Sequence, residues 1–144
     1  MTARERLRRI LNWINLSTVC GLGIARARRC EVRRGSNGLT FAFKYTGRLP
    51  VASAFTVGNV VLFRASPENI RPQLIAHEAR HSTQYAACLG LPFLPLYFLG
   101  AGWSILRTGD PASRNIFERW AGLRDGGYTE KPLRRNRRRG KDGS

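Results

Sequence analysis

The chain contains few of the residues from which proteins usually build disulfide and metal sites. Its 144 residues include three cysteines, two histidines and nine acidic residues, against 25 Lys and Arg. The cysteines, Cys20, Cys30 and Cys88, are too few and too scattered for a disulfide framework, and no Cys-x-x-Cys pair is present for a metal. An odd number of thiols fits a reducing compartment, so we expect a cytoplasmic protein.

The shortage of acids leaves a formal net charge of +16. Such a charge attracts nucleic acid, anionic lipid or acidic protein, but it identifies neither a fold nor a reaction. The sequence has no groove-entering element or stacking platform, so we expect nucleic acid to bind nonspecifically if it binds. Much of the positive charge lies near the two ends of the chain, at Arg4, Arg6, Arg8, Arg9, Arg134, Arg135, Arg137, Arg138, Arg139 and Lys141.

Length and a hydrophobic content of 42% predict one domain, which we place at residues 1–130. Residues 131–144 are rich in Arg, Asn and Gly, and they predict a disordered basic tail. Residues 1–16 predict an amphipathic basic helix. Asn12 and Asn15 argue against the alternative, a signal peptide, because they interrupt the apolar run. The helix is indicated by apolar residues at helical spacing: Leu7, Ile10, Leu11 and Ile14.

Three segments have the composition of β-strands, namely residues 30–33, 39–45 and 55–63. The turn-forming residues 35–38 separate the first two strands and predict a hairpin. Residues 17–29 read as a connector of uncertain structure. With the helices below, these segments predict an α+β fold, in which a short antiparallel sheet or hairpin packs on a helical core.

Two helix-entry signals follow the strands. Residues 66–68 combine a capping Ser, a Pro and a Glu, and Pro72 is an alternative start for a helix that should end at Gly90. Asp110-Pro111 predicts the start of a second helix, which should reach about residue 124 and end at the glycines 126–127.

The first of these helices contains the motif His77-Glu78-x-x-His81, which uses both histidines of the chain. Two residues four apart lie on one helix face with Cβ atoms about 5–6 Å apart, so the two imidazoles can reach one metal ion. Glu78 lies one step round the helix, where it can take a proton from a metal-bound water. The alternative is a chance arrangement on a polar helix face.

A catalytic zinc site needs a third protein ligand and leaves one position for water. No third histidine exists, so an acid must supply it. Glu118 is favoured because it lies within a packable helix, and the small Ala121 follows on the same side and allows close approach. Asp110 and Asp125 stay open as alternatives, although a helix cap and a solvated helix end explain them as well. Glu118 itself could instead be an exposed carboxylate paired with a neighbouring arginine.

The pattern His-Glu-x-x-His-x-x-Gln over residues 77–84, followed by Glu-x-x-Ala over residues 118–121, resembles the gluzincin group of zinc metallopeptidases and small bacterial metallopeptidase-like proteins. The resemblance covers residues 56–128. It implies a zincin-like core in which two helices supply the ligands and a nearby edge strand, here residues 57–63, aligns a peptide or protein substrate. The chain is shorter than is usual for these peptidases, whose further domains form a cleft.

Carried over by position, the resemblance implies Zn²⁺ as the cofactor, with His77, His81 and Glu118 as its ligands and Glu78 as the general base. It does not identify the group that stabilises an oxyanion. The candidates for that role are Tyr45, Tyr85, Tyr128, Arg80 and Arg119.

Residues 89–106 form a strongly apolar stretch without a charged residue. We expect a buried connector and short core helix. The alternatives are an interfacial membrane contact through Tyr97 and Trp103, or a single membrane span. A full span would put His77 and Glu118 on opposite sides of the bilayer and exclude a shared metal. The basic ends would support peripheral attachment of a cytoplasmic protein to an anionic membrane surface.

The sequence therefore predicts a zinc-dependent hydrolase, in particular a small metallopeptidase. Two alternatives stay open. One is a metal-stabilised domain without turnover, and the other is a basic membrane-binding or nucleic-acid-binding module in which the motif is accidental.

Overall fold

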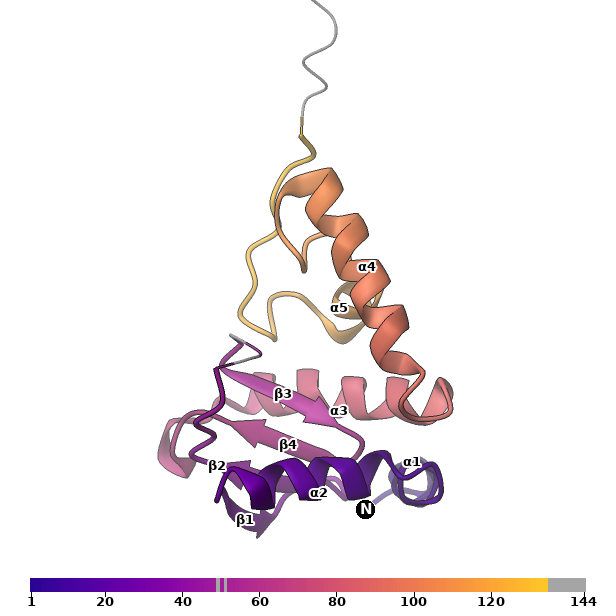
Figure 1. The fold of residues 1–144 in the computed structure, drawn as a ribbon, viewed down its shortest axis with the longest axis vertical. Coiled ribbons are helices and arrows are strands. Elements are labelled where there is room, and N and C mark those ends of the chain that lie inside the picture. Colours follow the sequence, from indigo (N-terminus) through magenta and orange to yellow (C-terminus); the bar gives the residue numbers. More distant parts are fainter. Residues whose placement is uncertain (49, 51, 135–144) are drawn as a thin grey trace, which may run out of the picture.

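The structure is a computed structural model that describes residues 1–48, 50 and 52–134. Within these residues the chain has an α+β fold with five α-helices and one small mixed sheet (Figure 1). The elements in chain order are α1 (Ala3–Ile14), α2 (Ser17–Ala27), β1 (Glu31–Arg34), β2 (Thr40–Phe43), β3 (Ala54–Val57), β4 (Val60–Phe63), a 3₁₀ turn η1 (Pro67–Asn69), α3 (Pro72–Ala87), α4 (Phe93–Thr108) and α5 (Ile116–Ala121).

The sheet has four strands in the order β1-β2-β4-β3. β1 and β2 form the predicted antiparallel hairpin, and β3 and β4 form a second one. β2 and β4 run parallel, so the expectation of a purely antiparallel sheet is wrong in this respect. The predicted single strand over residues 55–63 is also wrong. Gly58 has a φ of +63° and turns the chain there, and a Cβ at this position would lie 2.4 Å from the Thr18 nitrogen.

β4, one of the two inner strands, is buried on both faces. Val60 and Leu62 pack in one apolar cluster with Ala25 of α2, whereas Val61 and Phe63 pack in a second cluster. That second cluster contains Leu74 and Ile75 of α3. The residues 17–29 are therefore not a connector, because α2 covers part of the sheet that would otherwise face water.

Buried polar residues join α1 to the start of β4 and to α3. The Asn12 amide donates to Asn59 Oδ1 at 3.0 Å and to the Ser82 carbonyl at 2.9 Å. Arg8 donates to the Ala79 carbonyl at 3.3 Å and also to the Asn37 carbonyl. Since Ala79 and Ser82 flank His81, these bonds help to fix the position of the helix that carries the motif.

The second half of the chain departs from the prediction in two places. α5 spans only six residues and begins after Asn115, which caps it by accepting from the Phe117 nitrogen at 3.1 Å. Asp110 caps a turn before α5, because its carboxylate accepts from the backbone nitrogens of Ala112 and Ser113. Residues 135–144 of the predicted tail lie outside the described residues.

The apolar segment 89–106 contains a helix, α4, but most of that helix is not buried. Large apolar side chains of α4 face solvent, whereas Ala101, Ser104 and Thr108 face the protein. The expectation of a buried core helix is therefore wrong. In the described part of the chain, α4 and the other helices are all too short or too polar to cross a bilayer.

Candidate metal centre

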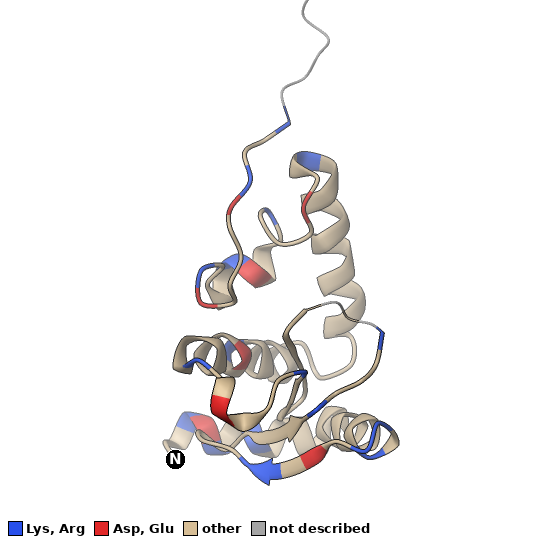
Figure 2. Cartoon of the chain, turned by 90° about the vertical axis from the view of Figure 1, so that its left-hand side faces the viewer, with Lys and Arg blue, Asp and Glu red and all other residues tan. Residues whose placement is uncertain are grey.

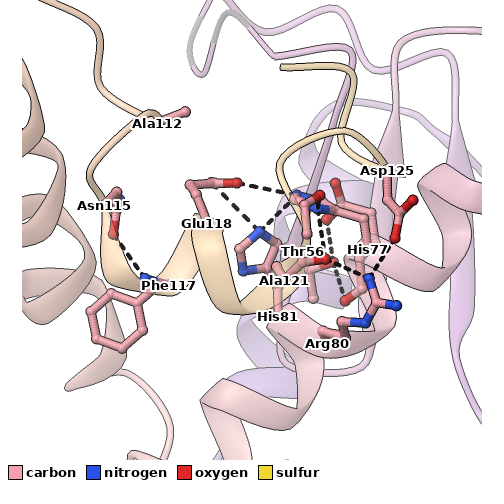
Figure 3. A network of polar contacts seen from close by, with 12 residues as sticks. Thr56, His77, Arg80, His81, Ala112, Asn115, Phe117, Glu118, Ala121 and Asp125 are labelled. Atoms are coloured by element: carbon pink, nitrogen blue, oxygen red, sulfur yellow. Dashed lines mark hydrogen bonds and ion pairs between the residues drawn. The ribbon is translucent and has the colours of Figure 1, made fainter. Parts of the chain in front are cut away.

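The two histidines of the motif lie on the face of α3 that meets α5, and Glu118 of α5 points towards them (Figure 3). His77 Nε2 lies 3.0 Å from His81 Nε2. Glu118 Oε2 lies 3.2 Å from His77 Nε2, and Oε1 lies 3.5 Å from His81 Nε2. The three residues predicted as ligands are therefore close together, and as a buried His-His-Glu group they could hold a metal ion.

In each of the two histidines, the hydrogen bond made by Nδ1 decides whether Nε2, which faces the other ring, can act as an acceptor. His77 Nδ1 lies 3.1 Å from the Ala121 carbonyl oxygen and 3.0 Å from that of Gly122. A carbonyl oxygen only accepts, so Nδ1 carries the proton, and Nε2 of the neutral ring presents a lone pair. A metal-ligating histidine commonly donates its other N–H to a carbonyl in this way, which fixes the ring.

His81 is oriented in the same manner through Gln84. The Gln84 amide nitrogen donates to the Phe117 carbonyl at 2.9 Å, and this bond assigns the amide oxygen to the histidine. That oxygen lies 2.7 Å from His81 Nδ1, which therefore donates to it. Since Phe117 precedes Glu118, Gln84 also ties the histidine helix to the helix that supplies the acid.

Glu118 completes the group and lies on the short helix α5, which is capped by Asn115. Its helix packs on α4 where Gly100 leaves room, because a Cβ there would lie 2.6 Å from Oδ1 of the capping Asn115. One turn earlier on α4, the Tyr97 hydroxyl donates to Glu118 Oε1. Burial raises the pKa of Tyr97 well above its usual value, so this hydroxyl keeps its proton. Within the described residues, Glu118 Oε2 is buried and has no hydrogen-bond partner.

The charge of Glu118 matters for what the group can bind. Burial raises the pKa of the Glu118 carboxyl, but a proton shared with the His77 and His81 nitrogens that face it, together with the Tyr97 hydroxyl, holds this pKa below its usual range. When the protons of both rings are on Nδ1, two imidazole lone pairs and one carboxylate converge with no proton among them. Such a set of acceptors is electrostatically unfavourable unless a cation lies among them.

The spacing of these atoms agrees with a small tetrahedral cation. Ligands at about 2.0–2.1 Å from a tetrahedral zinc ion lie roughly 3.3 Å from one another. The Nε2 atoms of His77 and His81 lie 3.0 Å apart. One Glu118 oxygen, Oε2, lies 3.2 Å from His77 Nε2, and the other, Oε1, lies 3.5 Å from His81 Nε2. The donor set of two imidazoles and one carboxylate is also one that zinc uses in catalytic sites.

Glu78 is buried beside the ligands but is not one of them. The Thr56 hydroxyl of β3 lies 2.7 Å from Glu78 Oε2 and donates to it (Figure 3). Burial raises the pKa of Glu78 above its usual value, and the hydrogen bond from Thr56 acts in the opposite direction. Thr56 was not singled out by the sequence, because no local pattern links it to a residue 22 positions away.

The strand beside this site is β3 and not the whole of residues 57–63. β4 pairs with strands on both sides, so its backbone groups are already used by the sheet. β3 is the terminal strand in the sheet order and contains Thr56, which contacts Glu78. The edge strand next to the site is therefore β3, Ala54–Val57, and not residues 57–63.

The two alternative third ligands lie elsewhere. Asp110 is used by the backbone of Ala112 and Ser113, as described above. Asp125 accepts from Arg80 Nη1 at 2.7 Å, and the same nitrogen donates to the Ala121 carbonyl at 2.6 Å. This pair holds the loop after α5 against α3, next to the carbonyl that orients His77.

The structure also separates the candidates for oxyanion stabilisation. Tyr85 packs against Phe93 in the core, and Tyr45 packs against Phe55. The Tyr128 ring lies 6.0 Å from that of His77, in the loop that follows α5. Of the three tyrosines, Tyr128 is therefore the one beside the candidate metal centre.

Gly126 closes the site from the same loop. A Cβ at Gly126 would lie 2.6 Å from His77 Cε1 and 2.8 Å from His77 Nε2. We expect Gly126→Ala to displace the imidazole or the loop, and to lower metal affinity by about 10-fold or more. Gly102→Ala is the matched control, because a Cβ there meets no atom within 4 Å. Competition with a fluorescent zinc chelator measures both, and equal affinities would show that Gly126 does not shape the site.

No protein-family model, curated protein or solved structure matches this chain. The candidate metal centre is therefore supported by the three grouped residues and by the contacts that orient them.

Proposed function

We propose that this protein is a zinc-dependent hydrolase of gluzincin type, with a peptide or protein as substrate. The observation that supports this most directly is the convergence of His77 Nε2, His81 Nε2 and the Glu118 carboxylate, with Glu78 buried next to them. Two helices contribute these residues and an edge strand lies alongside, as in the zincin-like core that the motif suggests.

His77, His81 and Glu118 would hold the ion. A zinc ion in such a site acts as a Lewis acid, polarising a carbonyl and making a coordinated water more acidic. Glu78 would take the proton from the water that attacks the substrate carbonyl and pass it to the leaving nitrogen. Thr56 would hold the Glu78 carboxylate in position, and the unpaired edge of β3 would align an extended peptide by backbone hydrogen bonds.

One observation favours a second candidate, a metal-stabilised domain without turnover. The three ligands are at most 7% exposed, and Glu78 is 3% exposed. A substrate carbonyl must reach the ion, so catalysis requires that the loop after α5 or a neighbouring segment moves aside. A structural metal requires no such opening.

Zinc loading tests the part that both candidates share. We expect one tightly bound zinc per chain after loading and dialysis, measured by elemental analysis. Zinc at about 1,000 times its dissociation constant should raise the free energy of unfolding by about 4 kcal/mol, which a chelator should reverse. The variant with both His77 and His81 replaced by Ala is the control and should bind none. Zinc below one-tenth per chain in the folded wild type would contradict both candidates.

A further inference from the structure

α1 has its apolar residues on the outside. Arg8 and Asn12 are buried against the protein, where they make the hydrogen bonds described above. The large apolar residues of this helix face solvent, namely Leu7, Ile10, Leu11, Trp13 and Ile14. The amphipathic helix predicted for residues 1–16 is therefore present, but its apolar face does not contribute to the core.

The C-terminal half of α4 shows the same inversion, although Phe93 and Ala101 of this helix are buried. Ser104 and Thr108 are buried and accept or donate within the turn around Asp110. The exposed apolar residues of α4 are Leu96, Phe98, Leu99, Trp103, Ile105 and Leu106. Single exposed apolar residues are ordinary, but two helices with inverted burial indicate surfaces that meet an apolar phase.

The segment that follows α1 lies against the segment that precedes α4. A Cβ at Gly90, just before α4, would lie 2.7 Å from the Asn15 side chain, just after α1. Leu16 and Leu89, next to this junction, are exposed as well. In Figure 1, α1, the α3–α4 loop and α4 follow one another along the right-hand side. We call the exposed apolar residues of α1, α4 and residues 16 and 89 the apolar side.

The charges around the apolar side are positive. α4 carries no charge along most of its length, and its only charged residue, Arg107, lies at the C-terminal end (Figure 2). The guanidinium of Arg107 lies 5.4 Å from the Trp103 ring centroid. α1 contributes exposed Arg4, Arg6 and Arg9, whereas its one acid, Glu5, is used in a capping box with Thr2.

We propose that the apolar side binds the surface of a membrane that contains anionic lipid. Aliphatic side chains would enter the acyl boundary, tryptophans would lie at the headgroup level, and the arginines would meet lipid phosphates. A second copy of this chain fits the same face less well, because each chain has a net charge of +16 and the arginines of the two copies would face each other. The proposal is independent of the zinc site.

Vesicle co-sedimentation tests the proposal. We expect the protein to sediment with vesicles of phosphatidylcholine and phosphatidylglycerol, and about tenfold less with phosphatidylcholine alone. The double variant Ile14→Glu, Leu106→Glu changes one exposed residue on each helix, and it should reduce binding to the anionic vesicles by about tenfold or more. Zinc binding and the thermal midpoint of each variant show that it is folded.

Val32→Glu is the control for an added negative charge, because it places one such charge at an exposed apolar position on β1. We expect it to lower vesicle binding less than about twofold. Equal binding of the double variant and the wild type would overturn the proposal, since the arginines alone would then suffice. The proposal would also fail if the wild type did not sediment with anionic vesicles, or if it formed a dimer that the double variant abolished.

Discussion

Glu118→Ala is expected to lower zinc affinity by at least about 100-fold. Loss of a partner that merely orients a metal ligand costs about 10–100-fold, and Glu118 is proposed as a direct ligand. Its Oε1 accepts from Tyr97, whereas Oε2 is buried without a hydrogen-bond partner among the described residues and lies 3.2 Å from His77 Nε2, where a metal ion would use it. Chelator competition gives the dissociation constant, and circular dichroism shows whether the variant is folded.

Three further variants sharpen this result. Asp110→Ala and Asp125→Ala remove the acids that compete with Glu118 in the sequence, and each should change zinc affinity less than about tenfold. Glu118→Gln keeps the shape of the side chain and can still accept from Tyr97, so any loss of affinity reports the missing charge. If Glu118→Ala bound zinc like the wild type, Glu118 would not be a ligand.

Glu78→Gln is expected to abolish hydrolysis and leave zinc binding nearly unchanged. A glutamine can still accept the hydrogen bond from Thr56, but it cannot take a proton from water. Loss of a general base lowers the rate by about 10²–10⁴-fold. The rate of hydrolysis of a panel of fluorogenic peptides measures this loss. Glu68→Gln is the control, because Glu68 is exposed.

The two outcomes of the peptide assay separate the candidates. Turnover by the wild type that disappears in Glu78→Gln supports the hydrolase. A zinc-loaded wild type that cleaves no peptide supports the metal-stabilised domain instead. Turnover that persists in Glu78→Gln would contradict the role proposed for Glu78 whichever substrate is used.

The parts of the site that the sequence predicts well are those with local spacing. His77 and His81 are four residues apart, so a helix alone brings their imidazoles together. Glu118 is 37 residues beyond His81, and its grouping with them depends on how α5 packs, yet the scarcity of acids left few alternatives. Tyr97 and Thr56, which hold Glu118 and Glu78, have no local pattern and come from tertiary packing alone.

The fold was predicted less completely, for physical reasons that differ between segments. The residues 17–29 contain two glycines and begin with Ser, Thr, Val and Cys, which are weak helix formers, so packing of α2 on the sheet contributes to the stability of this helix. Residues 55–63 are rich in β-branched residues, which obscured the Gly58-Asn59 turn. In α1 and in the C-terminal half of α4, hydrophobicity did not indicate burial, because polar residues face the protein there, namely Arg8, Asn12, Ser104 and Thr108.

The most direct test of the proposed metal centre is a crystal structure of the zinc-loaded protein, with anomalous scattering measured on both sides of the zinc absorption edge. We expect one strong anomalous peak, about 2.0–2.2 Å from His77 Nε2, His81 Nε2 and a Glu118 oxygen. A peak elsewhere, or imidazoles that bind different ions without Glu118, would contradict the central claim.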